Sequence, residues 1–116
     1  MLQLLGRLSS INVRKVVWLC AELGIPFERE DWGAGFRNPK EAGFLELNPN
    51  ALVPVINDGG FVLWESSAIL RYLAAKNGGE NLLGEGLEQR AIVDQWFHWQ
   101  TSDLNGAWAY AVQALI

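Results

Sequence analysis

The stretch LVPVINDGGFVLWESSAILRYL, from Leu52 to Leu73, contains the signals that decide the fold. Two apolar runs, 53–57 and 61–64, are separated by an Asp-Gly-Gly turn, and this spacing predicts a β-hairpin. The segment 65–76 has apolar residues at helical spacing and predicts a helix directly after the hairpin. Two features of the stretch need an explanation: a proline inside the first strand, and a Glu-Ser-Ser sequence where the second strand becomes a helix.

The residues before this stretch predict two further strands and two helices. A short apolar run at 2–5 predicts the first strand, and the segment 13–23 has one apolar face at helical spacing. The alternation over 27–31 indicates a second strand, and 41–47 indicates a short helix. A helix between two successive strands implies that they pair in parallel, whereas the hairpin adds an antiparallel pair. We therefore expect an α/β domain with a small mixed sheet and helices on its faces.

The rest of the chain predicts a separate helical segment. The polar stretch 77–86 contains four glycines and indicates a linker, and the segment 87–116 is helical again. Trp96, Trp99 and Trp108 give this segment an apolar surface that needs a partner. We therefore predict self-association, as a homodimer.

The composition narrows the range of partners and compartments. The chain has 116 residues, a formal net charge of −4 and no run of like charges, which argues against nucleic acid and anionic membranes as partners. Cys20 and His98 are single residues of their types, so neither an internal disulfide nor a Cys/His metal cluster is possible, and no metal is expected. No apolar run reaches transmembrane length. We predict a cytoplasmic protein.

Pro54 interrupts the first strand of the hairpin. A proline removes one hydrogen-bond donor from a sheet and is confined to strand edges and bulges. The common case is a trans proline at the start of a strand. A cis bond is the alternative, and it would leave the backbone N–H and C=O of Val53 free to pair with an extended, peptide-like ligand. The residues alone leave both alternatives open.

Glu65 and Ser66 stand at the start of the helix that follows the hairpin. A helix N-terminus has free N–H groups and a partial positive charge. Ser66 could cap the helix, which is the frequent use of such a residue, or help to bind a carboxylate. Glu65 could meet an ammonium group. Together the two side chains match the head group of an amino acid.

Ser9, Ser10 and Asn12 lie between the first strand and the first helix, where open α/β sheets bind ligands. A hydroxyl group there could cap the helix or donate a hydrogen bond to a bound thiolate. No histidine lies nearby to act as a base, so a Ser-His-Asp hydrolase is disfavoured. The chain has no CxxC pair, which excludes a dithiol oxidoreductase. Cys20 falls on the apolar face of its helix, which predicts a buried, inert thiol.

Three segments in this order and spacing resemble the glutathione transferase family. They are ELGIPF at 22–27, LNPNALVP at 47–54 and LWESSAILRYL at 63–73. The resemblance covers nearly the whole chain. Residues 1–80 look like the N-terminal thioredoxin-like domain of the family, with a mixed four-stranded sheet. Residues 87–116 look like the first helix of an otherwise incomplete C-terminal helical domain.

The resemblance implies how the two features of the opening stretch are used. It implies that Pro54 is cis and that the backbone of Val53 pairs with the cysteinyl part of glutathione. It implies that Glu65 and Ser66 hold the γ-glutamyl head group of the same molecule. Both features would then bind one tripeptide.

The resemblance also implies the residues that act on the sulfur and on the far end of the tripeptide. Ser10 corresponds to the serine that stabilises the glutathione thiolate, with Asn12 two residues later and Ser9 as the alternative register. Arg37 and Lys40 would bind the glycine carboxylate.

The implied function is that of a glutathione transferase, in which glutathione is the co-substrate and its thiolate attacks a small electrophile. One alternative is a glutathione-dependent reductase that acts on a disulfide. Another is a non-catalytic binding module, because only one helix of the second domain is present. The sequence does not identify the electrophile.

Overall fold

The computed structural model of the protein describes residues 1–107, and its centre is a mixed four-stranded sheet. The strands are β1 (Leu2–Leu5), β2 (Phe27–Glu30), β3 (Val55–Asp58) and β4 (Phe61–Trp64), and they lie in the order β2-β1-β3-β4. β1 pairs in parallel with β2, whereas β3 is antiparallel to both β1 and β4. The α/β fold expected from the sequence is confirmed.

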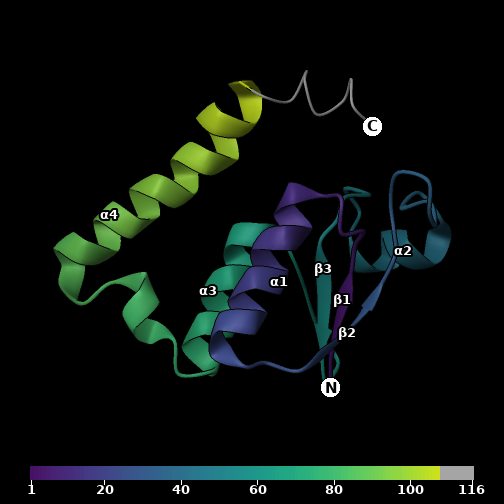
Figure 1. Ribbon diagram of the computed structural model, residues 1–116. Helices are drawn as coiled ribbons and strands as arrows, with labels where there is room; N and C mark the ends of the chain where they lie inside the picture. Colours follow the sequence, from purple (N-terminus) through teal and green to yellow (C-terminus); the bar gives the residue numbers. More distant parts are fainter. Residues whose placement is uncertain (108–116) are drawn as a thin grey trace.

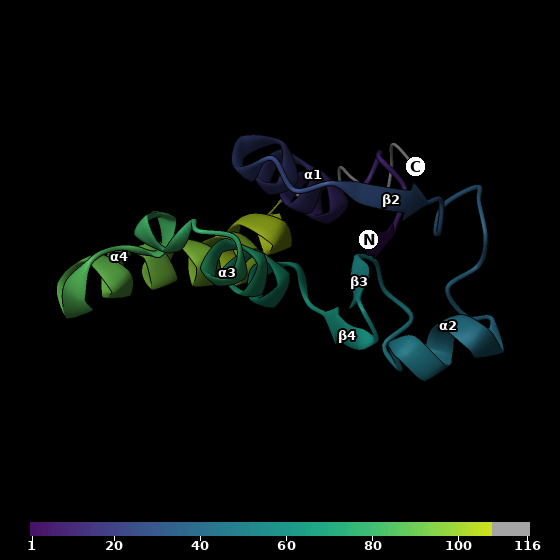
Figure 2. The ribbon, with the colours of Figure 1, turned by 90° about the horizontal axis from the view of Figure 1, so that it is seen from below.

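Helices cover both faces of the sheet. α1 (Ile11–Leu23) and α3 (Ser66–Lys76) lie side by side on one face, and the short α2 (Ala42–Leu47) lies on the other (Figures 1 and 2). α4 (Gly86–Trp99) extends beside α3 and continues into a π turn, Gln100–Leu104. The stretch predicted as a linker contains a short 3₁₀ helix, Glu80–Leu83.

Alternate residues along the central strands fill two cores of unequal size. The larger core lies between the sheet and the α1/α3 pair, and its members Leu4, Val16, Ile56 and Ile69 are fully buried. Cys20 is buried in this core, as the sequence predicts, and burial raises the pKa of its thiol. Burial of this apolar area is the main stabilising contribution to the domain.

The smaller core lies under α2, on the opposite face of the sheet. Leu5 and Val55 point to this side, where the rings of Trp32 and Phe44 pack against each other with centroids 4.9 Å apart. Val53 packs against both cores from the edge of the sheet. The backbone of Val53 is therefore fixed by packing on both faces of the sheet.

The first strand of the hairpin is shorter at its start than predicted. The sequence analysis placed that start at residue 53, whereas β3 begins at Val55. Pro54 has no N–H to donate to the neighbouring strand, so the pairing with β1 starts only at Val55, opposite Leu5. The expectation for the start of this strand was therefore wrong by two residues.

The predicted helical segment that begins at residue 87 is helical up to residue 107, the last residue that the structure describes. Trp108, which the sequence analysis assigned to the self-association surface, lies outside the described residues. Within 1–107, no helix is long and apolar enough to cross a membrane.

Candidate functional site

A cleft of about 380 Å³ lies where the start of α1, the loop before β3 and the start of α3 come together. The end of α4 closes it from the opposite side, because the π turn contributes to its wall. Figure 1 shows this end of α4 near the first turn of α1. The lining residues are Asn12, Asn48, Asn50, Leu52, Val53, Pro54, Trp64, Glu65, Ser66, Thr101 and Asn105.

Val53 and Pro54 form one wall of the cleft. The peptide bond between them is cis. The pairing of β3 with β1 covers Val55 to Asn57, so the N–H and C=O groups of Val53 stand outside that ladder. The side chain of Val53 is packed against the core while its backbone borders the cleft. A main-chain donor and a main-chain acceptor are thus placed side by side for an extended ligand.

The loop that presents Val53 is organised by a buried asparagine. Asn48 is only 2% exposed, and its amide donates to the carbonyl oxygen of Leu52 at 3.0 Å. Its side-chain oxygen accepts from the backbone N–H of Asn50 at 3.0 Å. Asn48 was not predicted as a site residue. The Asn-Pro-Asn sequence was the available signal, because Asn side chains often hold turns in this way.

Glu65 and Ser66 form the second wall, at the start of α3. Ser66 is 5% exposed and is the first residue of the helix, whereas Glu65 is exposed. The Glu65 carboxylate accepts a long hydrogen bond of 3.4 Å from the N–H of Ser67. The residue that caps α3 is therefore Glu65 and not Ser66, for which the sequence left capping open. The Glu65 carboxylate retains most of its hydrogen-bonding capacity toward the cleft.

Ser10 and Asn12 lie at the start of α1 and have different surroundings. Ser10 is 9% exposed and caps the helix, because its hydroxyl oxygen accepts from the N–H of Val13 at 3.4 Å. Accepting this bond leaves the hydroxyl proton free to be donated. Ser10 is not among the residues that line the cleft. Asn12 lines the cleft, and its buried Oδ1 has no hydrogen-bond partner within residues 1–107. Ser9 is exposed on the turn before Ser10.

Asn12 is the residue of the cleft wall that has a buried polar atom without a partner within residues 1–107, whereas the other two such atoms, Nε of Arg7 and Nε1 of Trp32, belong to residues outside the cleft lining. A buried polar atom without a partner costs about 1–3 kcal/mol. Because Oδ1 of Asn12 is itself buried, a ligand with an N–H, O–H or S–H group would reach it only after a small movement of this side chain.

Arg37 and Lys40 lie on the loop after β2 and are not among the residues that line the cleft. The guanidinium group of Arg37 is within 3.7 Å of Glu30 and 3.5 Å of Glu41, and it stacks over Trp32 at 4.0 Å from the ring centroid. Both side chains are exposed. Their role toward a glycine carboxylate stays a prediction.

Thr101 and Asn105 were also missed by the sequence analysis. Thr101 reaches the cleft from the π turn and Asn105 from the residue directly after it, both far along the chain from the other lining residues. The hydroxyl groups of Thr101 and Ser67 lie 3.3 Å apart, which joins the π turn to the first turn of α3. No local pattern predicts this contact, because it depends on how α4 is placed against α3.

The described residues contain no group of three or more His, Cys, Asp or Glu side chains that could hold a metal ion. The chemistry available in the cleft is therefore that of hydroxyl, amide and carboxylate side chains, of main-chain groups and of two helix N-termini. Such a set is suited to a ligand that has several polar groups along an extended chain.

Comparison with known proteins agrees with this arrangement. The family described as "Glutathione S-transferase, N-terminal domain" matches residues 9–76. Glutathione S-transferase GstB of Escherichia coli K12 is 40% identical over 109 residues, which are 92% of this chain and 52% of that protein. Glutathione S-transferase F12 of Arabidopsis thaliana is 40% identical over 105 residues, covering 89% and 49%.

A solved structure extends the comparison to three dimensions. The theta class glutathione S-transferase of Xanthomonas axonopodis pv. citri, with glutathione bound, superposes with a TM-score of 0.87 at 38% identity, over 93% of this chain and 52% of that one. The chain thus spans about half the length of the relatives it matches. Since the family match covers more than half of the residues and includes both helices that border the cleft, the chain belongs to the glutathione S-transferase family.

Proposed function

We propose that the cleft binds glutathione and stabilises its thiolate for attack on a small electrophile. The observation that carries this proposal is the meeting of Asn12, Val53, Glu65 and Ser66, from three separate segments, around one cleft. Relatives named as glutathione S-transferases favour transfer over disulfide reduction and over a non-catalytic module.

The γ-glutamyl head group is assigned to the start of α3. Its carboxylate accepts hydrogen bonds from Ser66 and from the free N–H groups of the helix, whose partial positive charge favours an anion. Its ammonium group is bound by the carboxylate of Glu65, which borders the same cleft. Opposite charges at neighbouring positions suit a zwitterion, because each group meets its complement.

The cysteinyl part of glutathione is assigned to Val53. Its peptide N–H and C=O pair with the main chain of Val53 as a short antiparallel ladder, in the way that extended peptides add to a sheet. This register places the sulfur toward the start of α1. Arg37 and Lys40, on the exposed loop after β2, are proposed to bind the glycine carboxylate at the far end.

Ser10 and Asn12 are proposed to act on the sulfur. Ser10 donates its hydroxyl proton to the thiolate while its oxygen keeps the N–H of Val13, and the N-terminus of α1 adds favourable electrostatics. Both effects lower the thiol pKa, so its proton passes to solvent on binding. The sulfur then forms a bond to the electrophilic carbon, and the leaving group departs with the bonding electron pair.

We also propose that the protein works in the cytoplasm and forms a homodimer. Trp96 and Trp99 support association, because they are 57% and 42% exposed and pack edge to face with centroids 5.4 Å apart. Static light scattering measures the mass of the particle, and a monomer at high concentration would count against the dimer.

Calorimetric titration with glutathione tests the proposed function. We expect a dissociation constant between about 1 µM and 1 mM, the usual range for enzyme substrates. Ser66→Ala removes a hydrogen bond to the head-group carboxylate and is expected to weaken binding about fivefold.

The matched control for this titration is Asn77→Ala. The side-chain amide of Asn77 donates to the carbonyl oxygen of Leu73 at 2.8 Å, at the end of α3 away from the cleft, so its loss leaves the affinity unchanged. A folded wild-type protein that gives no heat of binding with millimolar glutathione would refute the proposed function.

A further inference from the structure

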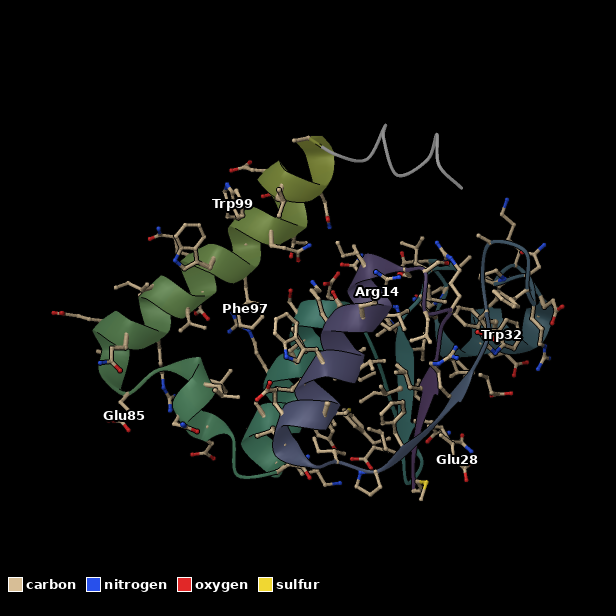
Figure 3. All side chains as sticks on the ribbon, in the orientation of Figure 1. Arg14, Glu28, Trp32, Glu85, Phe97 and Trp99 are labelled. Carbon is tan, nitrogen blue, oxygen red and sulfur yellow. The ribbon has the colours of Figure 1, made fainter. Side chains whose placement is uncertain are left out.

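α4 is joined to α1 and α3 by a row of side-chain contacts that includes few apolar ones. Figure 3 shows Phe97 on the side of α4 that faces these two helices and Trp99 on the outer side. The contacts are the ion pair of Arg71 with Asp94, the stacking of Arg71 on Phe97, the hydrogen bond of Lys15 to Gln100 and the contact of Ser67 with Thr101. Polar contacts therefore set where the end of α4 lies.

Lys15 is the half-buried member of this row. Its ammonium group donates to the side-chain oxygen of Gln100 at 2.5 Å. Burial lowers the pKa of Lys15, and the negative charge of Glu65 opposes this by raising it. A desolvated ammonium depends on its protein partner more than an exposed one does, because water replaces the lost bond poorly. Lys15 thus contributes to the placement of α4 together with the partly exposed pair of Arg71 and Asp94.

Gln100 connects Lys15 to the cleft wall through its side chain. It is the first residue of the π turn, and its side-chain amide donates to Oδ1 of Asn105 at 3.0 Å. Thr101, within this turn, and Asn105, directly after it, line the cleft, whereas Lys15 itself does not. A continuous series of hydrogen bonds therefore runs from α1, through Gln100, to the cleft wall that α4 provides. π turns are frequent at functional sites, where they redirect side chains.

We propose that Lys15 is a positioning residue, which fixes the π turn through Gln100 so that Thr101 and Asn105 contact the bound ligand. The proposal rests on the function proposed above, because the ligand in question is glutathione. Glutathione is then held from two sides, by the thioredoxin-like domain and by the end of α4. Lys15 acts on the affinity without touching the ligand.

Three variants test this role. Lys15→Met keeps the aliphatic stem and removes the ammonium, and we expect it to weaken glutathione binding about fivefold. Lys15→Arg keeps a cationic donor and is expected to restore most of the affinity. Gln100→Leu removes the acceptor and should show the same loss, while the double variant with Lys15→Met shows no further loss, because both changes break one link.

The matched control is Lys76→Met. Lys76 also donates to one side-chain oxygen, here of the acid Asp58 at 2.6 Å, but it does so at the last turn of α3, away from the cleft. This variant is expected to lose some stability and none of its glutathione affinity. Urea denaturation of every variant shows whether an affinity change merely follows a loss of folding, because the control supplies a destabilised protein with an intact cleft.

Hydrogen exchange in the ligand-free protein separates this inference from the proposed function. In Lys15→Met and Gln100→Leu, the backbone amides of residues 100–107 are expected to exchange faster than in the wild type. The exchange rates of the α1 amides are expected to stay unchanged. Unchanged exchange overturns the positioning role, and so does faster exchange with unchanged affinity. A wild-type protein that does not bind glutathione refutes the proposed function, whereas the exchange result still decides whether Lys15 fixes the π turn.

Discussion

Gly6→Ala is expected to lower the free energy of unfolding by about 2 kcal/mol, because the added methyl group has no room. A Cβ at this position would lie 2.4 Å from Cγ2 of Val13 and 3.3 Å from Cβ of Val53. Val13 is fully buried in the core under α1, and Val53 is packed between the two cores, so neither can move away easily. Relief requires a shift of α1 away from the sheet.

Gly43→Ala is the control for this prediction. Gly43 lies in α2 with nothing within 4 Å of an added Cβ, so alanine there is expected to stabilise the helix by about 0.5–1 kcal/mol. Urea denaturation followed by tryptophan fluorescence measures both variants. Equal stability of Gly6→Ala and the wild type would show that the start of α1 is free to move.

Glu65→Gln is expected to weaken glutathione binding about tenfold, because it removes the charged partner of the γ-glutamyl ammonium. Glutamine has nearly the same shape and can still accept the N–H of Ser67, so the cap of α3 and the fold are kept. The backbone of Glu65 has a φ of 80°, and an unbranched side chain at this position also keeps the local conformation comparable.

A second ligand makes this test specific for the charge. N-acetylated glutathione has no ammonium group, so the wild type is expected to bind it more weakly than glutathione. Glu65→Gln should bind the two ligands almost equally, since the group that distinguishes them has lost its partner. Calorimetric titration of both proteins with both ligands gives the coupling directly. A Glu65→Gln protein that keeps the full preference of the wild type would contradict the assigned role of the carboxylate.

The sequence predicts the parts of the fold that depend on residues close together in the chain. The Asp-Gly-Gly turn and the apolar runs on either side of it are sufficient for the β3–β4 hairpin and the start of α3. Val53, Glu65 and Ser66 belong to this one unit, so their meeting at one cleft follows from local structure. The predicted start of β3 was wrong because the apolar pattern continues through Pro54, whose missing N–H group ends the pairing with β1.

The remaining part of the site depends on contacts between distant segments. Lys15 and Gln100 are 85 residues apart, and neither the apolar periodicity of α1 nor that of α4 indicates that they meet. Thr101 and Asn105 enter the cleft only because such contacts bring the end of α4 over it. The charge of Arg37 was evident from the sequence, but its pairing with Glu30 and Glu41 was not, since several acids compete for it nearby.

The π turn at Gln100–Leu104 determines which side of the following helix faces the cleft. A π turn holds about one residue more than an α turn, and each residue of an α-helix turns the chain by about 100°. If the same residues formed a regular α-helix, Asn105 would rotate by roughly that angle, away from the cleft it now lines. Deleting one residue within the turn would instead give a regular helix in which Asn105 keeps its present direction. The extra residue of the π turn therefore sets the phase of the helix beyond it, and a change in that phase would remove Asn105 from the cleft without altering any cleft-lining side chain.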